Sequence, residues 1–175
     1  MPVFAVLAAG CNTPEDAVRE TMARVESAAV HGDRETLFLL HHDSVDGGPF
    51  CAPSFAAAWQ AGGRATPEVC DQARLVRETP AAGGEEAQLL ALTLDFRCSH
   101  PEGSCQDLAR AAFLSRVAAT PGALDSLEVN RIEVRDDGQS AAVHSTLYRA
   151  AGEKTRAVFT LKRVGARWLL TSAPF

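Results

Sequence analysis

The chain has 175 residues, 46% of them hydrophobic, which is enough for one domain to bury a core without a metal or a partner. Its formal charge of -5 comes from interspersed acidic and basic residues, so no basic face is offered to nucleic acid, and we expect no nucleic-acid partner. After the first ten residues, no apolar run approaches the ~18 to 20 residues that span a bilayer.

The chain begins with an uncharged segment that ends at Cys11, followed by a polar helix-start signal. Its last five residues, Leu7-Ala8-Ala9-Gly10-Cys11, resemble the lipobox of bacterial lipoproteins, although Leu7 is one place further from the cysteine than usual and no basic residue precedes the apolar stretch. A start codon assigned too far downstream would explain why no basic residue precedes the apolar stretch. The resemblance implies a removable signal segment at 1–10 and a lipid on Cys11. A cytosolic first β-strand is the alternative.

Helices are expected along the first half of the chain. Thr13 to Asp16 form a capping box that opens a long helix, and Gly32 ends it. Asp33 caps a second, short helix. Residues 43–53 are expected to form a loop, 54–60 one or two helical turns, and 66–79 a helix that Pro80 stops.

The five cysteines become four once Cys11 carries a lipid. An oxidising compartment outside the cytoplasm would permit two disulfides, and no zinc-ligand spacing is present. Three pairings are open; we favour Cys51 with Cys70 and Cys98 with Cys105, because each pair closes a local loop. Four unpaired buried thiols are the alternative.

The second half of the chain is expected to be mainly strands. Residues 90–96 alternate apolar and polar side chains, which predicts a half-buried strand, and the capping box Ser104 to Asp107 opens a helix that ends by Pro121. The segments 129–135, 140–149, 155–164 and 167–173 are separated by short turn signals and predict a four-stranded antiparallel meander. The apolar phase slips between Val129 and Ile132, which indicates a β-bulge.

The predicted fold class is therefore α+β, with a long N-terminal helix and further helices packed on a curved, mainly antiparallel sheet. The chain resembles the nuclear transport factor 2-like superfamily in four segments: 14–18, Gly32-Asp33, 137–143 and 165–170. The resemblance implies a single cone-shaped domain over 11–175, with a disulfide-bearing insertion around 43–84 that roofs the cone. The matching residues are packing and turn positions, so they say little about function.

Enzymes of that superfamily use a buried acid and a Tyr or protonated acid, and this chain has a single tyrosine, Tyr148. We expect Tyr148 and His144 to share one strand face that lines a pocket or faces solvent, with Trp59 and Trp168 in the core or at the pocket rim. Asp95 would be the nearest acid, but we expect it to face away from the hollow. No catalytic residue is therefore assigned.

A metal or cofactor is not expected. The densest set of possible metal ligands consists of His41, His42, Asp43 and Asp46. Adjacent histidines at a helix end point in different directions, so we interpret this cluster as a solvated helix end. No dinucleotide or phosphate-binding motif occurs.

The sequence thus suggests an exported module without catalytic activity, anchored in the bacterial cell envelope by a lipid on Cys11. Facing the periplasm or the exterior, it would bind a small apolar ligand or an envelope partner. The alternative is a small-molecule isomerase, dehydratase or cyclase that uses the cone cavity.

Overall fold

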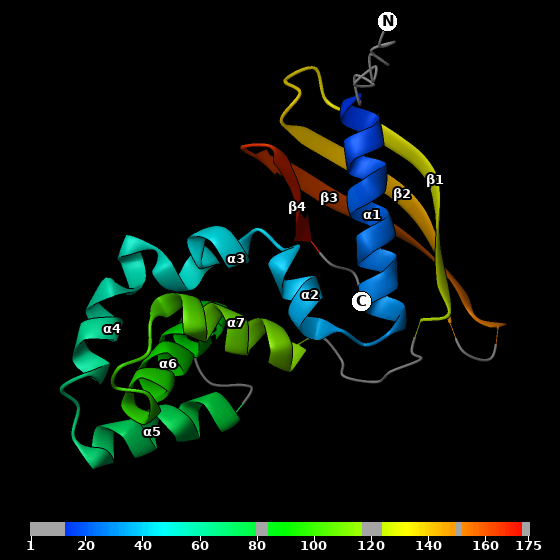
Figure 1. Ribbon diagram of the computed structural model, residues 1–175. Helices are drawn as coiled ribbons and strands as arrows, with labels where there is room; N and C mark the ends of the chain where they lie inside the picture. Colours follow the sequence, from blue (N-terminus) through cyan, green and yellow to red (C-terminus); the bar gives the residue numbers. More distant parts are fainter. Residues whose placement is uncertain (1–12, 80–83, 117–123, 150–151, 173–175) are drawn as a thin grey trace, which may run out of the picture. The chain divides into compact units, whose positions relative to one another are not determined.

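The structure is a computed structural model, and it describes residues 13–79, 84–116, 124–149 and 152–172. These residues form an α+β fold, as the sequence predicts (Figure 1). The chain divides into two compact units, one holding 1–31 and 122–174 and the other holding 32–121. The sequence predicts a single domain with an insertion around 43–84, and in the structure that segment belongs to the unit that holds 32–121, which we call the helical unit.

The sheet unit contains one helix and four strands. The helix is α1 (Pro14–Val30), and the strands are β1 (Ser126–Val134), β2 (Ser140–Tyr148), β3 (Lys154–Val164) and β4 (Arg167–Ser172). The strands pair antiparallel in the order β1-β2-β3-β4, which confirms the predicted meander. The register shifts between Val129 and Arg131, where the sequence predicts a bulge.

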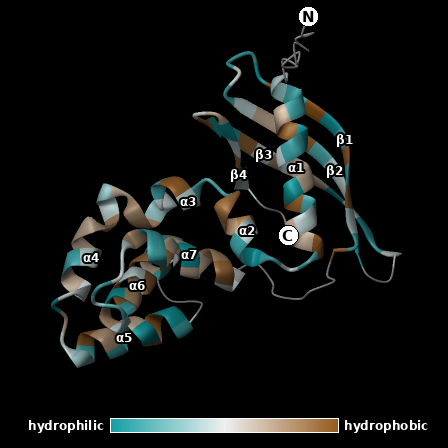
Figure 2. Ribbon diagram, viewed as in Figure 1, coloured by the Kyte–Doolittle hydropathy of each residue, from teal (hydrophilic) through white to brown (hydrophobic). Residues whose placement is uncertain are grey.

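Helix α1 begins where the sequence predicts, because Thr13 and Asp16 form the reciprocal hydrogen bonds of a capping box. Its apolar stripe includes Val18 and Met22, which are fully buried, and α1 packs against β1 and β4. Along α1 and the strands, hydrophobic residues are interspersed with hydrophilic ones, as Figure 2 shows. Buried side chains on the sheet include Val143, Leu147, Phe159, Leu161, Trp168 and Leu170.

The helical unit is built from short and medium helices, with two 3-10 turns between them. In chain order they are α2 (Arg34–Leu39), α3 (Asp43–Asp46), η1 (Gly48–Cys51), η2 (Pro53–Phe55), α4 (Ala56–Gly62), α5 (Pro67–Glu78), α6 (Gly84–Ser99) and α7 (Cys105–Arg116). Helices α4 and α5 both pack on α6, and α7 packs against α2, α3 and η1. Phe50, Leu108, Ala109 and Ala112 form a buried cluster, onto which Trp59 and Phe96 pack.

The strand predicted over 90–96 was wrong, since these residues lie in the middle of α6. The segment has apolar side chains on more than one side because α4 and α5 both pack on this helix. A helix that buries several faces loses the 3.6-residue pattern and imitates the alternation of a strand.

The favoured disulfide pairing was also wrong. Cys51 pairs with Cys105, and Cys70 pairs with Cys98, with Cα–Cα distances of 5.3 and 5.9 Å. The pairing follows from the packing of α6, which runs back along α5 and so places its last turn beside the first turn of α5. Because the sequence predicts a strand over 90–96, it does not predict that α6 packs along α5. Loop length alone then favours pairs of cysteines that are close in the sequence.

Candidate functional site

The four residues predicted to line a pocket are not brought to one place. Trp59 belongs to the helical unit, while His144, Tyr148 and Trp168 belong to the sheet unit. Within the sheet, Trp168 is buried on the core face, whereas His144 and Tyr148 alternate with the buried residues of β2 and so lie on the opposite face. Cys11 lies outside the described residues.

His144 and Tyr148 share one face of β2, as predicted, and each contacts an acid of the neighbouring strand β1. The Nε2 atom of His144 lies 3.3 Å from Glu133, and the Tyr148 hydroxyl donates a 2.6 Å hydrogen bond to Glu128. That hydrogen bond, with smaller contributions from desolvation and from the charge of Glu128, raises the pKa of Tyr148. A raised pKa keeps the phenol protonated, so Tyr148 is a neutral cross-strand partner.

Asp95 belongs to the helical unit, on α6. Its side chain is only 13% exposed, and its Oδ2 atom lies 3.1 Å from Nη1 of Arg77 on α5. The sequence predicts that Asp95 lies on a strand and faces away from the hollow of the sheet. This prediction does not apply, because residues 84–99 form a helix. Asp95 is instead an ion-pair partner that joins two helices.

The histidines after α2 do point in different directions, as predicted. The ring of His41 lies 5.1 Å from that of Phe113, while Nδ1 of His42 lies 3.0 Å from Asp46. Ligand atoms of His42, Asp43 and Asp46 all lie within 4.8 Å of one another. Contacts within the protein already engage these acids, since Asp46 pairs with His42 and Asp43 lies 3.6 Å from Nδ1 of His41.

The described residues instead form a groove between α5, α6 and α7, in the helical unit. It consists of two adjoining cavities, of about 520 and 300 Å³, which share Phe96, His100 and Ala111; we call it the α6–α7 groove. Both volumes are comparable with small-molecule pockets, of about 300 to 1,000 Å³. The larger cavity is also lined by Pro101, Glu102, Gly103, Asp107, Arg110 and Leu114, and the smaller by Arg74, Arg77, Leu92, Asp95, Ser99, Leu108, Ala112 and Ser115.

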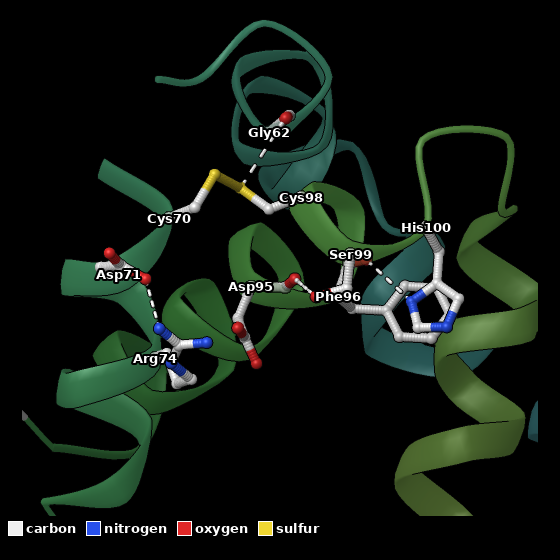
Figure 3. Close-up of a disulfide and its surroundings, with 9 residues drawn as sticks. All are labelled: Gly62, Cys70, Asp71, Arg74, Asp95, Phe96, Cys98, Ser99 and His100. Atoms are coloured by element: carbon white, nitrogen blue, oxygen red, sulfur yellow. Dashed lines mark hydrogen bonds and ion pairs between the residues drawn. A yellow bond between two sulfur atoms is a disulfide. The ribbon is translucent and has the colours of Figure 1, made fainter. Parts of the chain in front are cut away.

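The wall shared by the two cavities is a stack of rings at the end of α6 (Figure 3). The ring of His100 stacks on that of Phe96, with centroids 4.3 Å apart and planes 14° apart, as their spacing of one helical turn permits. Phe96 also stacks on Trp59, with centroids 6.4 Å apart. The Phe-x-x-x-His spacing of Phe96 and His100 is a signal in the sequence that becomes visible once 84–99 is recognised as a helix.

Arg97 organises the loop that follows α6. Its Nη1 donates to the carbonyl oxygens of His100, Pro101 and Gly103, and its guanidinium lies 5.1 Å from the ring centroid of Trp59. The loop therefore enters α7 in a fixed position. There Ser104 and Asp107 form the predicted capping box, which lowers the pKa of the Asp107 carboxyl chiefly through the Ser104 hydroxyl.

The disulfide Cys70–Cys98 ties together two of the helices that form the groove. Figure 3 shows it between α5, which carries Arg74 one turn after Cys70, and α6, which carries Asp95 one turn before Ser99. The disulfide Cys51–Cys105 links η1 to the start of α7, which is the third of the helices that form the groove. Both covalent links thus hold the walls of the groove.

The two hydroxyl groups and the carboxylate of the smaller cavity are already engaged within the protein. The hydroxyl of Ser99 donates to the Asp95 carbonyl oxygen at 3.0 Å, and that of Ser115 donates to Ala112 at 2.9 Å. Asp95 is held by Arg77. A nucleophilic hydroxyl needs a base within hydrogen-bond reach, and these hydroxyls donate to helix carbonyls instead.

No protein-family model matches the chain, and the searches of curated proteins and of solved structures find no match either. Within the described residues, no helix is both long and apolar enough to cross a bilayer.

Proposed function

We propose that this protein is an exported module without catalytic activity, held to the bacterial cell envelope by a lipid on Cys11, that binds a small apolar ligand. The observation that carries the proposal is the link between the disulfides and the groove: both disulfides hold helices that line it. Disulfides persist outside the reducing cytoplasm, which favours a periplasmic or exterior location. The four described cysteines are consumed by this pairing, which leaves Cys11 for a lipid.

A binding role is favoured over an isomerase-like one by two features of the described residues. The acid and the tyrosine considered for catalysis each have a partner within the protein, since Asp95 pairs with Arg77 and Tyr148 is bound to Glu128. The lining of the groove is rich in apolar side chains, among them Leu92, Phe96 and Ala111, which can exclude water from a bound molecule.

Ligand binding is tested with N-phenyl-1-naphthylamine, a neutral apolar dye that fluoresces when it leaves water. We expect the full chain to enhance its fluorescence saturably. Ala111→Phe should abolish the enhancement, because Ala111 is exposed and lines both cavities. Ala23→Phe, at an exposed position of α1 in the sheet unit, is the matched control. Equal binding by the wild type and Ala111→Phe would place the ligand outside the groove and contradict the proposal.

A further inference from the structure

Two arginines of α5 stand at the rim of the smaller cavity. Arg74 and Arg77 are three residues apart, so they lie on the same side of the helix, and both line the cavity. Their side chains are 54% and 44% exposed, so the guanidinium groups are accessible from solvent. A ligand entering the cavity from this side meets two positive charges.

Each of these arginines keeps hydrogen-bonding capacity for a ligand. Arg74 pairs with Asp71, and Arg77 pairs with Asp95 through Nη1. A guanidinium has five N–H donors, and one carboxylate takes at most two of them, so donors remain on both side chains. Asp95 is the single carboxylate among the residues that line this cavity, and Asp71 balances the charge of Arg74 from outside it. The rim therefore offers a carboxylate spare N–H donors on two guanidinium groups, without an excess of positive charge.

Beyond the rim the lining is apolar, and it continues past Phe96 and Ala111 into the larger cavity as far as Leu114. The far cavity carries two acids, Glu102 and Asp107, against one arginine, Arg110, which is bound to Glu35 through two hydrogen bonds. A carboxylate thus finds unused guanidinium donors at the α5 end, whereas acidic side chains predominate at the other end. A molecule that matches both features has an anionic head and an apolar tail.

We propose that the ligand of the α6–α7 groove is a single-chain amphiphile with a carboxylate head, which the rim arginines bind, and a hydrocarbon tail, which lies along Phe96, Ala111 and Leu114. This inference rests on the ligand-binding function proposed above, and it adds the chemical class of the ligand and its direction in the groove.

The test compares three amphiphiles with the same twelve-carbon chain: dodecanoate, dodecanol and dodecyltrimethylammonium. Each displaces N-phenyl-1-naphthylamine from the full chain, at concentrations below micelle formation. We expect dodecanoate to compete best, by roughly tenfold or more, because charge-assisted hydrogen bonds are the strong ones. Its advantage should shrink as salt is raised, since the rim is exposed.

Variants of the two rim arginines test where the head group of the ligand binds. Arg74→Gln and Arg77→Gln should each remove most of the preference for dodecanoate over dodecanol. Arg64→Gln removes the same charge from the same unit at an exposed position outside both cavities, and it should leave the preference intact. Arg74→Gln is the cleaner of the two rim variants, because Arg77→Gln leaves the half-buried Asp95 without its partner.

The possible outcomes distinguish failure of this inference from failure of the proposed ligand-binding function on which it rests. Equal competition by the three amphiphiles would overturn the anionic head and leave an apolar ligand module standing. Competition by none of them, together with no binding of the dye, would overturn both. Binding to vesicles of phosphatidylglycerol without competition by dodecanoate would mean that a membrane surface, rather than a single-chain carboxylate, is recognised, and would also overturn the inference.

Discussion

At the scale of single residues, capping carboxylates make this protein sensitive to acid. Asp16, Asp33 and Asp107 each accept hydrogen bonds at the start of a helix, and these bonds lower the pKa of each carboxyl. A carboxyl with a lowered pKa holds its proton less tightly in the folded protein than in the unfolded chain. Its stabilising effect is therefore complete above the unfolded pKa, about 4, and is lost as the pH falls through the folded pKa.

Replacing Asp107 with Asn should reduce this sensitivity. We expect the free energy of unfolding of the wild type, measured by urea titration, to fall more steeply between about pH 4 and about pH 2 than that of Asp107→Asn, because the variant has no proton to gain at this cap. Glu102→Gln removes a nearby negative charge outside the capping box and serves as the control. If the free energy of unfolding depended on pH in the same way in Asp107→Asn and the wild type, Asp107 would not be a source of the acid sensitivity.

A second residue-scale prediction concerns Ser145, which is 2% exposed on the core face of β2 and whose hydroxyl has no hydrogen-bond partner among the described residues. A buried unsatisfied hydroxyl costs about 1 to 3 kcal/mol. Ser145→Ala should therefore leave the melting temperature unchanged or raise it. Ser140→Ala, on the same strand, removes a hydroxyl that donates to Asp137 and should lower it slightly. A clear loss of stability in Ser145→Ala would show that the hydroxyl is bonded after all.

At the scale of elements, the close packing of α4 on α6 depends on Gly62. A Cβ atom at Gly62 would lie 2.7 Å from Cβ of Arg97, whereas one at the neighbouring Gly63 would meet Arg97 no closer than 3.4 Å. We expect Gly62→Ala to lower the free energy of unfolding by about 1 to 3 kcal/mol, as overpacking does. Gly63→Ala, the matched control, should change it by less than about 1 kcal/mol. Equal effects of the two substitutions would show that α4 does not approach α6 this closely.

Elements were predictable from the sequence where local signals set them. The capping boxes at Thr13 and Ser104, the turn glycines Gly138 and Gly165, and the phase slip near Asn130 all predict what the structure shows. Helix α6 was missed because its apolar pattern is set by neighbours on several sides rather than by one face. The pairing of the cysteines and the groove both depend on α6, so neither could be predicted once that helix was taken as a strand.

At the scale of the whole molecule, the disulfides close long stretches of chain. The bonded cysteines are 54 and 28 residues apart, for which chain entropy gives roughly 3.5 to 4 kcal/mol each. The Cys70–Cys98 loop lies inside the other, so the two contributions are less than additive. Removing one disulfide should thus cost several kcal/mol, mainly in the helical unit.

The Cys70→Ser/Cys98→Ser double variant should lower the free energy of unfolding by about 2 to 4 kcal/mol. It should also weaken dye binding, because α5 and α6 would no longer be linked. The matched control is Cys51→Ser/Cys105→Ser, which spares the link between those two helices and should weaken dye binding less for a similar loss of stability. Full stability and full dye binding in the first variant would show that this disulfide does not hold the groove.

The proposed export and lipidation at Cys11 are tested most directly by mass spectrometry of the protein isolated from bacterial envelopes without reduction. We expect a mature chain that begins at Cys11, heavier by the mass of its acyl groups, with the other four cysteines oxidised as two disulfides. Cys11→Ser should give an unprocessed chain without that added mass. An unmodified wild-type chain that retains Met1 and has free thiols at Cys51, Cys70, Cys98 and Cys105 would contradict both export and lipidation.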